Sequence, residues 1–287
     1  MRVHHLDCAP MREIEPADGP ESPLRPARAV GHVLLVETGS AGLVLVDAGI
    51  GLGDIERPSE RLLDDWVEMA GPALDPAATA VRQVEGLGFP ASDVRHIVPT
   101  HLHRDHAGGL SDFPDAAVHL FEAERADGGK TPAQLAHGPK WVVYEGGEGG
   151  TWHGFDGVRA LEGVPEDILL IPLGGHTPGH AGVAVRDGDR WLLHAGDAYM
   201  YHGEVDRPEP VTHPLMELVQ AGGEVDRELR LANVARLREL ALARRGRGVL
   251  RPRPLGAAAL PLREAVRQRG VAAAGPGGAD GGGQRPP

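Results

Sequence analysis

Cysteine is almost absent from this sequence of 287 residues, because Cys8 is the only one. An internal disulfide is therefore excluded, and so is a structural zinc site built from several cysteines. The sequence also has no apolar run long enough to span a bilayer, and residues 1–10 contain no apolar segment of the kind that a signal peptide needs. These absences predict a cytoplasmic protein that does not interact with a membrane.

Aromatic residues and basic charge are also scarce. Aromatics make up 4% of the chain, so the core is expected to consist mainly of Leu, Val and Ala. Lys and Arg number 29 against 41 Asp and Glu, which gives a formal net charge of −12. Neutralising phosphates requires clustered Lys and Arg, so this balance disfavours nucleic acid as a partner. The hydrophobic content of 41% suffices for one large domain followed by a tail.

Apolar patterning predicts strands and helices without a simple βαβ alternation. The expected strands lie at 30–36, 43–46, 94–100, 117–121, 168–173, 183–186 and 190–194. Helices are expected at 75–87 and 228–244, and residues 54–70 also have helical spacing of apolar side chains. Residues 122–160, which are rich in Gly and polar residues, are interpreted as an insertion that covers a cleft. This pattern alone predicts an α/β fold with a mixed sheet.

The residues that could bind a metal or act in catalysis are concentrated at 100–109, Thr-His-Leu-His-Arg-Asp-His-Ala-Gly-Gly. Four potential metal ligands follow a predicted strand within six positions: His101, His103, Asp105 and His106. Imidazole and carboxylate suit zinc, iron or manganese. Both ligand types this close together favour two neighbouring ions, which can share a hydroxide and hold a developing oxyanion. The alternative, a polar surface loop, is disfavoured by the apolar strand before the motif and the Gly-Gly after it.

This motif, His-x-His-x-Asp-His, resembles the signature of the metallo-β-lactamase superfamily. The resemblance continues with Asp47 in Leu-Val-Asp-Ala-Gly, His176 in Gly-Gly-His-Thr-Pro-Gly-His, and Asp197 in His-Ala-Gly-Asp. It implies an αββα sandwich of two mixed β-sheets flanked by helices, formed by residues 1–245. Among the members of the family, the chain looks most similar to the N-acyl homoserine lactonase type.

The resemblance also implies a dinuclear site for two divalent ions, with Zn²⁺ as the expected metal. Its ligands would be His101, His103 and His176 for the first ion, Asp105 and His106 for the second, and Asp197 as a bridge between both. Asp47 is expected to orient the ligand loop without binding an ion. His180 is expected to support the site or to pack beside it, and a ligand role is the alternative.

The reaction that the resemblance implies is hydrolysis of a small lactone, ester or thioester by a hydroxide held between the ions. Asp197 would position this nucleophile, and Asp105 would take part in proton transfer. Tyr199 and Tyr201 are candidates to polarise the substrate carbonyl, with ordinary packing as the alternative. The expected partner is a small-molecule substrate, and a homodimer is left open.

Four aromatic residues in or near the Gly-rich segment have two interpretations. They are expected to anchor that segment, and the alternative is that they line an apolar acyl pocket; they are Trp141, Tyr144, Trp152 and Phe155.

One ligand of the family has no counterpart here. The family has a further His after its late helix, often in Ser-x-His-Asp, but the last histidine of this sequence is His213. The second ion is therefore expected to bind weakly. His202 is a candidate substitute, whereas His213 is expected at the surface. The main alternative function is an impaired or inactive metal-binding remnant. A di-iron redox protein is disfavoured, because the chain is too short to contain a flavin domain as well.

The composition changes after the late helix. Of the 42 residues at 246–287, 31 are Gly, Ala, Pro or Arg, and none is aromatic, Ile, Ser, Thr or Asn. This segment cannot supply a packed closing strand, so we predict a disordered tail. A natural tail is one explanation, and a frameshift near residues 244–248 is the one we favour.

The frameshift hypothesis rests on codon composition. GC-rich codons read out of frame yield Gly, Ala, Pro and Arg. One choice of codons for residues 249–256, read one base later, gives Ser-Ser-Ala-His-Asp-Pro-Ser, which contains the missing motif. The gene sequence decides the matter, because the hypothesis fails if no single-base shift restores a His-Asp pair.

Overall fold

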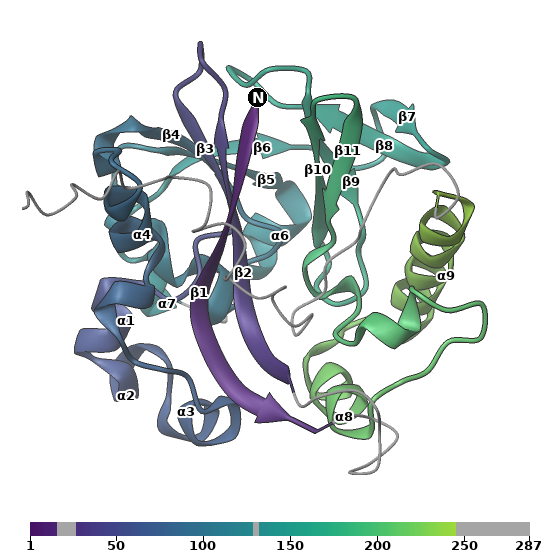
Figure 1. Ribbon diagram of the computed structural model, residues 1–287, viewed down its shortest axis with the longest axis horizontal. Coiled ribbons are helices and arrows are strands. Elements are labelled where there is room, and N and C mark those ends of the chain that lie inside the picture. The colour runs from purple at the N-terminus through teal and green to yellow at the C-terminus, as the bar shows by residue number, and fades with distance from the viewer. Residues whose placement is uncertain (16–26, 129–131, 245–287) are drawn as a thin grey trace, which may run out of the picture. The chain divides into compact units, whose positions relative to one another are not determined.

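The structure is a computed structural model that describes residues 1–15, 27–128 and 132–244 (Figure 1). The predicted tail at 246–287, and with it the proposed domain boundary at residue 245, lies outside the described residues. The described residues form two β-sheets with helices on their outer faces, so the predicted αββα sandwich is confirmed.

The first sheet has six strands in the order β1-β2-β3-β4-β5-β6. Their bounds are β1 Arg2–Ile14, β2 Ala27–Glu37, β3 Leu43–Val46, β4 Val94–Val98, β5 Ala117–Phe121 and β6 Lys140–Tyr144. Strands β1 to β3 pair antiparallel and β3 to β6 pair parallel, so the sheet is mixed as predicted. The expected first hairpin is confirmed as β2–β3, in which Leu34 lies opposite Val46.

The second sheet has five antiparallel strands in the order β11-β10-β9-β8-β7. Their bounds are β7 Gly150–Trp152, β8 Phe155–Ala160, β9 Ile168–Pro172, β10 Ala181–Asp187 and β11 Arg190–His194. The expected second hairpin is confirmed as β10–β11, in which Val183 lies opposite His194.

Helices occupy the connections between these strands and the end of the described chain. The α-helices are α1 Leu52–Glu56, α2 Pro58–Arg61, α3 Asp64–Ala70, α4 Ala80–Gly86, α5 Arg104–Ala107, α6 Glu122–Asp127, α7 Pro132–Leu135, α8 Pro214–Gly223 and α9 Arg227–Arg244. The 3₁₀ helices are η1 Pro76–Ala78, η2 Ala91–Asp93, η3 Gly108–Asp112, η5 Gly196–Ala198 and η6 His202–Glu204. Within the described ranges, none of the helices has the length and apolar character that a membrane span requires.

Alternating side chains on the strands divide the core into layers. Leu35 on β2 packs in a cluster that includes residues of α4 and η3, whereas the adjacent Leu34 packs against Val183 on β10 of the other sheet. On the far side of the second sheet, Ile171 packs in a cluster with Leu237 of α9. Because strand side chains alternate between two faces, each sheet has a helix-covered face and a face turned to the other sheet.

Two expectations about the fold are wrong. The predicted helix at 75–87 is two helices, because Thr79 is extended with ψ 151° and separates η1 from α4. The segment at 122–160 is not an insertion over a cleft: it supplies β6 at the edge of the first sheet and β7 and β8 in the second. These strands were not predicted because the segment is rich in Gly, which weakens the apolar pattern from which strands are predicted.

Two further elements had no counterpart in the prediction. Strand β1 is largely polar, but Leu6 and Cys8, two residues apart, are both buried and belong to one core cluster. Helix α8 begins after His213, whose Nδ1 accepts a hydrogen bond from the amide of Leu215. His213 is buried and its Nε2 donates to the carbonyl of Glu15, so the expected surface position of His213 is wrong.

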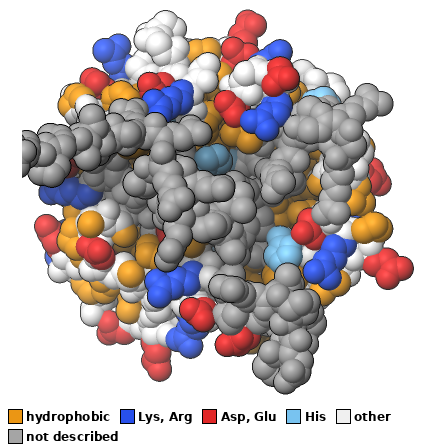
Figure 2. All heavy atoms as spheres, in the orientation of Figure 1, with side chains coloured by type: hydrophobic (Ala, Val, Ile, Leu, Met, Phe, Trp, Pro, Cys, Tyr) orange, Lys and Arg blue, Asp and Glu red, His pale blue; other side chains and the backbone are white. Residues whose placement is uncertain are grey.

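Charged side chains of both signs are interspersed on the coloured part of the face in Figure 2, around the residues that the figure leaves grey. This mixed distribution agrees with a chain in which acidic residues exceed basic ones without forming blocks of one sign.

Candidate metal centre

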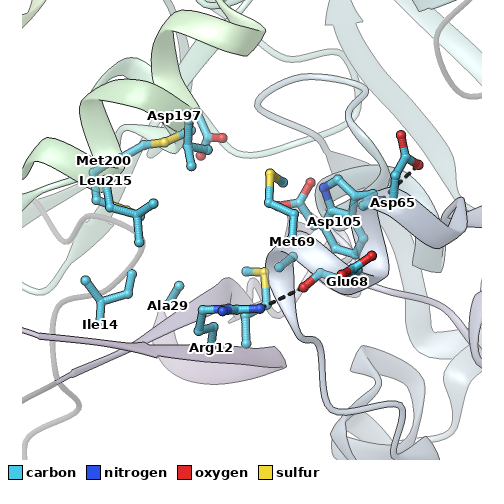
Figure 3. Close-up of a pocket in the computed structure, with 15 residues that line it drawn as sticks. Arg12, Ile14, Ala29, Asp65, Glu68, Met69, Asp105, Asp197, Met200 and Leu215 are labelled. Atoms are coloured by element: carbon cyan, nitrogen blue, oxygen red, sulfur yellow. Dashed lines mark hydrogen bonds between the residues drawn. The ribbon is translucent and has the colours of Figure 1, made fainter.

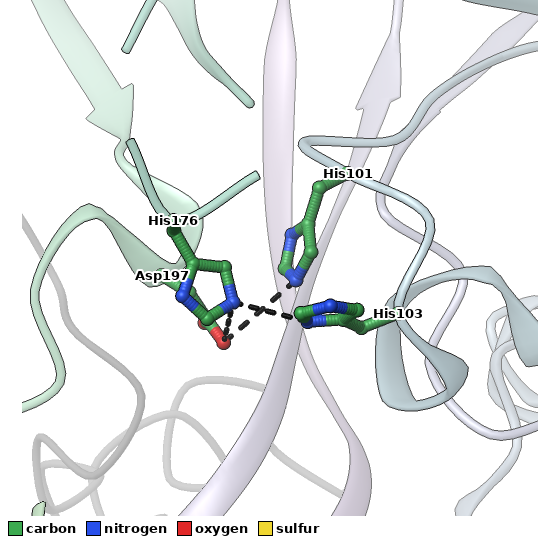
Figure 4. Close-up of side chains that lie close together, drawn as sticks. All are labelled: His101, His103, His176 and Asp197. Carbon is green, nitrogen blue, oxygen red and sulfur yellow. Dashed lines mark hydrogen bonds and ion pairs between the residues drawn. The ribbon is translucent and has the colours of Figure 1, made fainter. Parts of the chain in front are cut away.

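Three loops bring the predicted ligands together. The first follows β4 and carries His101 and His103, where His103 is the N-cap of α5. The second joins β9 to β10 and carries His176, and the third follows β11 and carries Asp197 in η5. Figure 4 shows these four side chains converging from both sheets. Strand ends of the two sheets meet at this edge of the sandwich, so residues 96 positions apart in sequence become neighbours.

The ligand atoms of the first group lie within 4.8 Å of one another; the group consists of His101, His103, His176 and Asp197. The Nε2 atom of His176 is 3.0 Å from Nδ1 of His103 and 3.5 Å from Oδ2 of Asp197. The Nε2 atom of His101 is 3.8 Å from the same carboxylate oxygen. Three imidazoles and a carboxylate are a suitable ligand set for a divalent ion such as zinc.

A second group faces the other oxygen of Asp197. The Nε2 atom of His106 lies 3.3 Å from Oδ1 of Asp197 and 3.7 Å from Oδ2 of Asp105. One carboxylate therefore has one oxygen toward each group, which is the arrangement that a bridging ligand requires. All six predicted ligands are in this region of the structure.

Several of these atoms are buried without a hydrogen-bond partner. They are Nε2 of His101, Nε2 of His106 and Oδ1 of Asp197. Leaving a buried polar atom unpaired is unfavourable, and native proteins rarely do so without a functional reason. Three such atoms within one cluster of imidazoles and carboxylates fit the binding of metal ions.

The protonation of the two groups differs. Burial, together with the neighbouring histidines, lowers the pKa of His101 well below its usual value, and the pKa of His176 is lowered for the same reasons. Neutral imidazole is the form that binds metals. Burial also opposes a charge on His106, but the carboxylates of Asp197, Asp47 and Asp105 outweigh it and raise the pKa of His106.

Asp47 contacts both the start of the motif loop and the second group. Its Oδ1 accepts a hydrogen bond of 2.6 Å from the amide of Thr100, and its Oδ2 is 2.9 Å from Nδ1 of His106. Burial opposes its ionised form, yet His106, His194 and the Thr100 amide lower its pKa. With Nδ1 of His106 directed at Asp47, Nε2 faces Asp197 and is the atom that an ion would bind after displacing its proton.

His180 supports the site and does not point into it. Its Nδ1 donates to the carbonyl of Leu173 at 3.1 Å, and its Nε2 accepts from the amide of Asp197 at 3.0 Å. Burial is the main reason why its pKa falls to about 3. Both ring nitrogens of His180 are thus hydrogen-bonded to backbone groups, so neither is available to bind an ion in this arrangement.

The Gly-Gly that ends the motif has a packing role. A Cβ atom on Gly109 would clash with the carbonyl of Ala48, which lies in the segment after β3. Gly109 donates to the carbonyl of Gly49 at 3.0 Å, and the Ala48 amide donates to the carbonyl of His106 at 2.9 Å. The absence of a side chain lets the motif loop lie directly against the segment that carries Asp47.

A cavity of about 500 Å³ opens beside the two carboxylates Asp105 and Asp197 (Figure 3). Four of the five methionines of the chain line it: Met11, Met69, Met200 and Met216. Its other lining residues are Arg12, Ile14, Ala29, Asp65, Trp66, Glu68, Ala70, Leu215 and Val219. The walls come from β1, α3 and α8, so an apolar chamber adjoins the candidate metal ligands.

The structure does not bring the two predicted tyrosines into this cavity. Tyr199 is fully buried in the core cluster beside α9, and its hydroxyl has no hydrogen-bond partner. The Tyr201 ring lies next to that of His213, and its amide donates to Glu204. Met200, between them, lines the cavity instead. A role for either tyrosine in polarising a carbonyl stays a prediction.

The structure also places the four aromatic residues of the Gly-rich segment and His202. The four aromatic residues of the Gly-rich segment pack in or against the core clusters, so they anchor it as expected; they are Trp141, Tyr144, Trp152 and Phe155. His202 pairs with Asp206 through Nδ1 at 2.9 Å. The structure gives no contact between His202 and the second group, so its role as a substitute ligand stays a prediction.

Comparison with known proteins agrees with this geometry. The sequence model of the Metallo-beta-lactamase superfamily matches residues 28–221. A probable metallo-hydrolase of Mycobacterium tuberculosis is 42% identical over 216 residues, which are 72% of this chain and 65% of that protein. The match thus spans just under two thirds of that relative's length.

Two further relatives have named activities. The N-acyl homoserine lactonase AttM of Rhizobium radiobacter is 31% identical over 128 residues, covering 40% of this chain and 44% of that protein. An acyl-coenzyme A thioesterase of Bos taurus is 32% identical over 180 residues, covering 58% of this chain and 57% of that protein.

Among solved structures, an N-acyl homoserine lactone hydrolase with the product N-hexanoyl-L-homoserine at its catalytic metal centre has the same fold. The TM-score is 0.61 at 21% identity, and the similarity covers 87% of this chain and 92% of that chain. The family match extends over more than half of the sequence, and it agrees with the sandwich fold and the convergent ligands. This chain therefore belongs to the metallo-β-lactamase superfamily.

Proposed function

We propose that this protein is a hydrolase that uses two divalent metal ions, Zn²⁺ in the native state, to cleave a small lactone, ester or thioester. The observation that carries the proposal is the convergence of unpaired buried atoms from His101, His106 and Asp197 beside an apolar cavity. Lactonase and thioesterase relatives support this reaction class. The proposal includes a cytoplasmic location and a small-molecule substrate as the principal partner.

Each residue of the centre has a part in this proposal. His101, His103 and His176 would hold the first ion, Asp105 and His106 the second, and Asp197 would lie between them. When bound, such ions polarise a carbonyl group and lower the pKa of a coordinated water. Asp197 would orient the attacking water through its two oxygens, and Asp105, which lines the cavity, would accept or return a proton.

The cavity supports an apolar acyl portion of the substrate. Met side chains are unbranched and flexible, so a wall built from them adapts to chains of different shape. A cavity of about 500 Å³ falls in the size range of small-molecule sites. Burial of the acyl portion would exclude water from the carboxylate side of the centre and hold the scissile carbonyl near Asp105 and Asp197.

A second candidate function follows from the incomplete second group. This sequence contains no histidine after His213, whereas the family has a further histidine ligand after its late helix. Under this alternative the chain is an impaired or inactive remnant that binds one ion.

Metal stoichiometry and turnover together distinguish the two candidates. The purified chain and the His103→Ala variant are analysed for metal content and assayed with an acyl lactone, an aryl ester and an acyl thioester. About two ions per chain, fewer in the variant, together with turnover would support the hydrolase. One ion or none, without turnover of any of the three substrates, would support the remnant.

A further inference from the structure

A single buried carboxylate connects two of the ligand-bearing loops. Glu124 lies on α6, an element that carries none of the candidate ligands, and it is 2% exposed. Its Oε1 accepts a hydrogen bond of 2.7 Å from the amide of Leu102, the residue between His101 and His103. Its Oε2 accepts a hydrogen bond of 2.5 Å from the hydroxyl of Thr177, the residue after His176.

Helix α6 also approaches the His176 loop at Gly179. Burial raises the pKa of Glu124, and the amide of Gly179 lies near enough to the carboxylate to oppose that rise. A Cβ atom on Gly179 would clash with the backbone and Cβ of Glu124, so the loop approaches the helix as closely as a glycine permits. The carboxylate thus receives donors from both loops, and these partly offset the cost of burying it.

The candidate ligands of these two loops lie close together. The nearest ring nitrogens of His103 and His176 are 3.0 Å apart, and the ligand atoms of the first group lie within 4.8 Å of one another. A ligand set keeps such a spacing when the backbone beneath it is fixed by other contacts.

We infer that Glu124 is a positioning residue for the candidate metal centre: it sets the spacing between the His101–His103 loop and the His176 loop. This inference rests on the proposed function, because it assumes that these histidines bind an ion. One oxygen serves each loop, so a side chain with a single acceptor cannot replace the carboxylate. Residues that orient metal ligands typically change metal affinity by 10- to 100-fold when they are mutated.

Matched variants test this inference. Glu124→Gln keeps the shape but replaces one acceptor with a donor, and Thr177→Val removes the hydroxyl on one side only. Glu122→Gln is the control for charge, because Glu122 is exposed on the same helix. Thr177→Ser keeps the hydroxyl that Thr177→Val removes, so it is the conservative control. We measure Zn²⁺ affinity by competition with a chelator, and we record the visible spectrum of the Co²⁺-loaded proteins.

The variants should differ in how much they weaken Zn²⁺ binding. Glu124→Gln should weaken binding of the first ion by about 10- to 100-fold, and Thr177→Val should weaken it less. Both variants should shift the Co²⁺ bands, because the ligand spacing changes. Thr177→Ser and Glu122→Gln resemble the wild type. Circular dichroism identifies any variant that fails to fold, and in that case Thr177→Val decides the matter.

Two results would overturn the inference. If Glu124→Gln and Thr177→Val, when folded, bind Zn²⁺ as tightly as Glu122→Gln and leave the Co²⁺ spectrum unchanged, Glu124 does not set the loop spacing. If the wild-type chain binds no ion, both this inference and the proposed function fail. A wild type that binds ions but hydrolyses no substrate contradicts the proposed function alone.

Discussion

Two groups of side chains meet at Asp197, and they differ in how many ligands each supplies. The first combines three imidazoles with Oδ2 of Asp197 and draws them from loops of both sheets. The second has His106 and Asp105 with Oδ1 of Asp197, and both come from the motif loop. The first group offers four ligand atoms, the number that a tetrahedral zinc site takes. The second group is held by Asp47, and among the described residues it brings together three ligand side chains.

If both groups bind an ion, as proposed, this difference shows what the absence of one ligand changes. The remaining ligands would keep their positions, because each is carried by its own loop. We therefore expect the two groups to respond differently to mutation and to pH. Five predictions examine this contrast, from the largest expected effect to the smallest.

The largest effect is expected for His176→Ala. It removes one of three imidazoles from the first group, so kcat/KM should fall by about 10³-fold or more, because metal ions supply several kcal/mol of transition-state stabilisation. His106→Ala should have a smaller effect, because the second group is already incomplete. Steady-state kinetics and metal content of both variants provide the comparison. Equal losses in the two variants would mean that the second group contributes as much as the first.

Asp47→Asn should act mainly on the second group. Asn presents an amide in place of one carboxylate oxygen, so His106 loses the acceptor that orients its ring. The affinity for the second ion should fall by about 10- to 100-fold and that for the first by much less. Stepwise titration with Zn²⁺, followed by calorimetry, separates the two ions. A parallel loss at both sites would show that Asp47 supports the whole centre.

Acidification should weaken the second group more than the first. The raised pKa of His106 means that an ion must displace a proton there, so its affinity should fall by up to about tenfold per pH unit below that pKa. His101 has a lowered pKa and is already neutral near pH 7. Chelator competition between about pH 8 and pH 6 measures both affinities. Identical pH slopes for the two ions would contradict the assigned protonation states.

The same shift has a consequence for the ion-free protein. Because the pKa of His106 is higher in the folded state than in the unfolded chain, it contributes stability that is complete below the unfolded value of about 6.5. This contribution is lost as the pH rises through the folded value. The Asp47→Asn variant, which lacks one of the carboxylates responsible, should show a weaker dependence of this kind.

Gln220→Ala should have the smallest effect, and it should be equal for both groups. The Gln220 side chain on α8 donates to the carbonyl of Asp197 at 2.8 Å, and Asp197 serves both groups. Loss of this buried hydrogen bond should lower the free energy of unfolding by about 1–2 kcal/mol. Thermal unfolding and Zn²⁺ titration measure the two quantities. Leu218→Ala is the control, because Leu218 is 71% exposed on the same helix.

The sequence was most informative where chemistry and periodicity coincide. The ligand motif could be predicted because imidazoles and a carboxylate follow an apolar strand at close spacing, and Asp197 follows the second predicted hairpin in the same way. The two hairpins could be predicted from apolar runs separated by turn residues. In each case the relevant signal lies within about ten neighbouring positions.

Features that arise from distant positions could not be predicted. Met11, Met69 and Met216 lie far apart in sequence and meet only at the cavity. Glu124 sits in a short helix among exposed residues, and nothing in the local pattern distinguishes it from Glu122. Strand β1 was missed because its outward positions are polar, and one buried face of a polar strand gives a weak apolar signal.

The cavity wall suggests how new activities arise in such a protein. Met11, Met69 and Met216 belong to β1, α3 and α8, none of which carries a candidate metal ligand. Under the proposed function, substitutions at these positions would alter which acyl groups fit and leave the ligand-bearing loops unchanged. A combinatorial library at these three positions is therefore a direct route to altered selectivity, and divergence among natural homologues should also be greatest there.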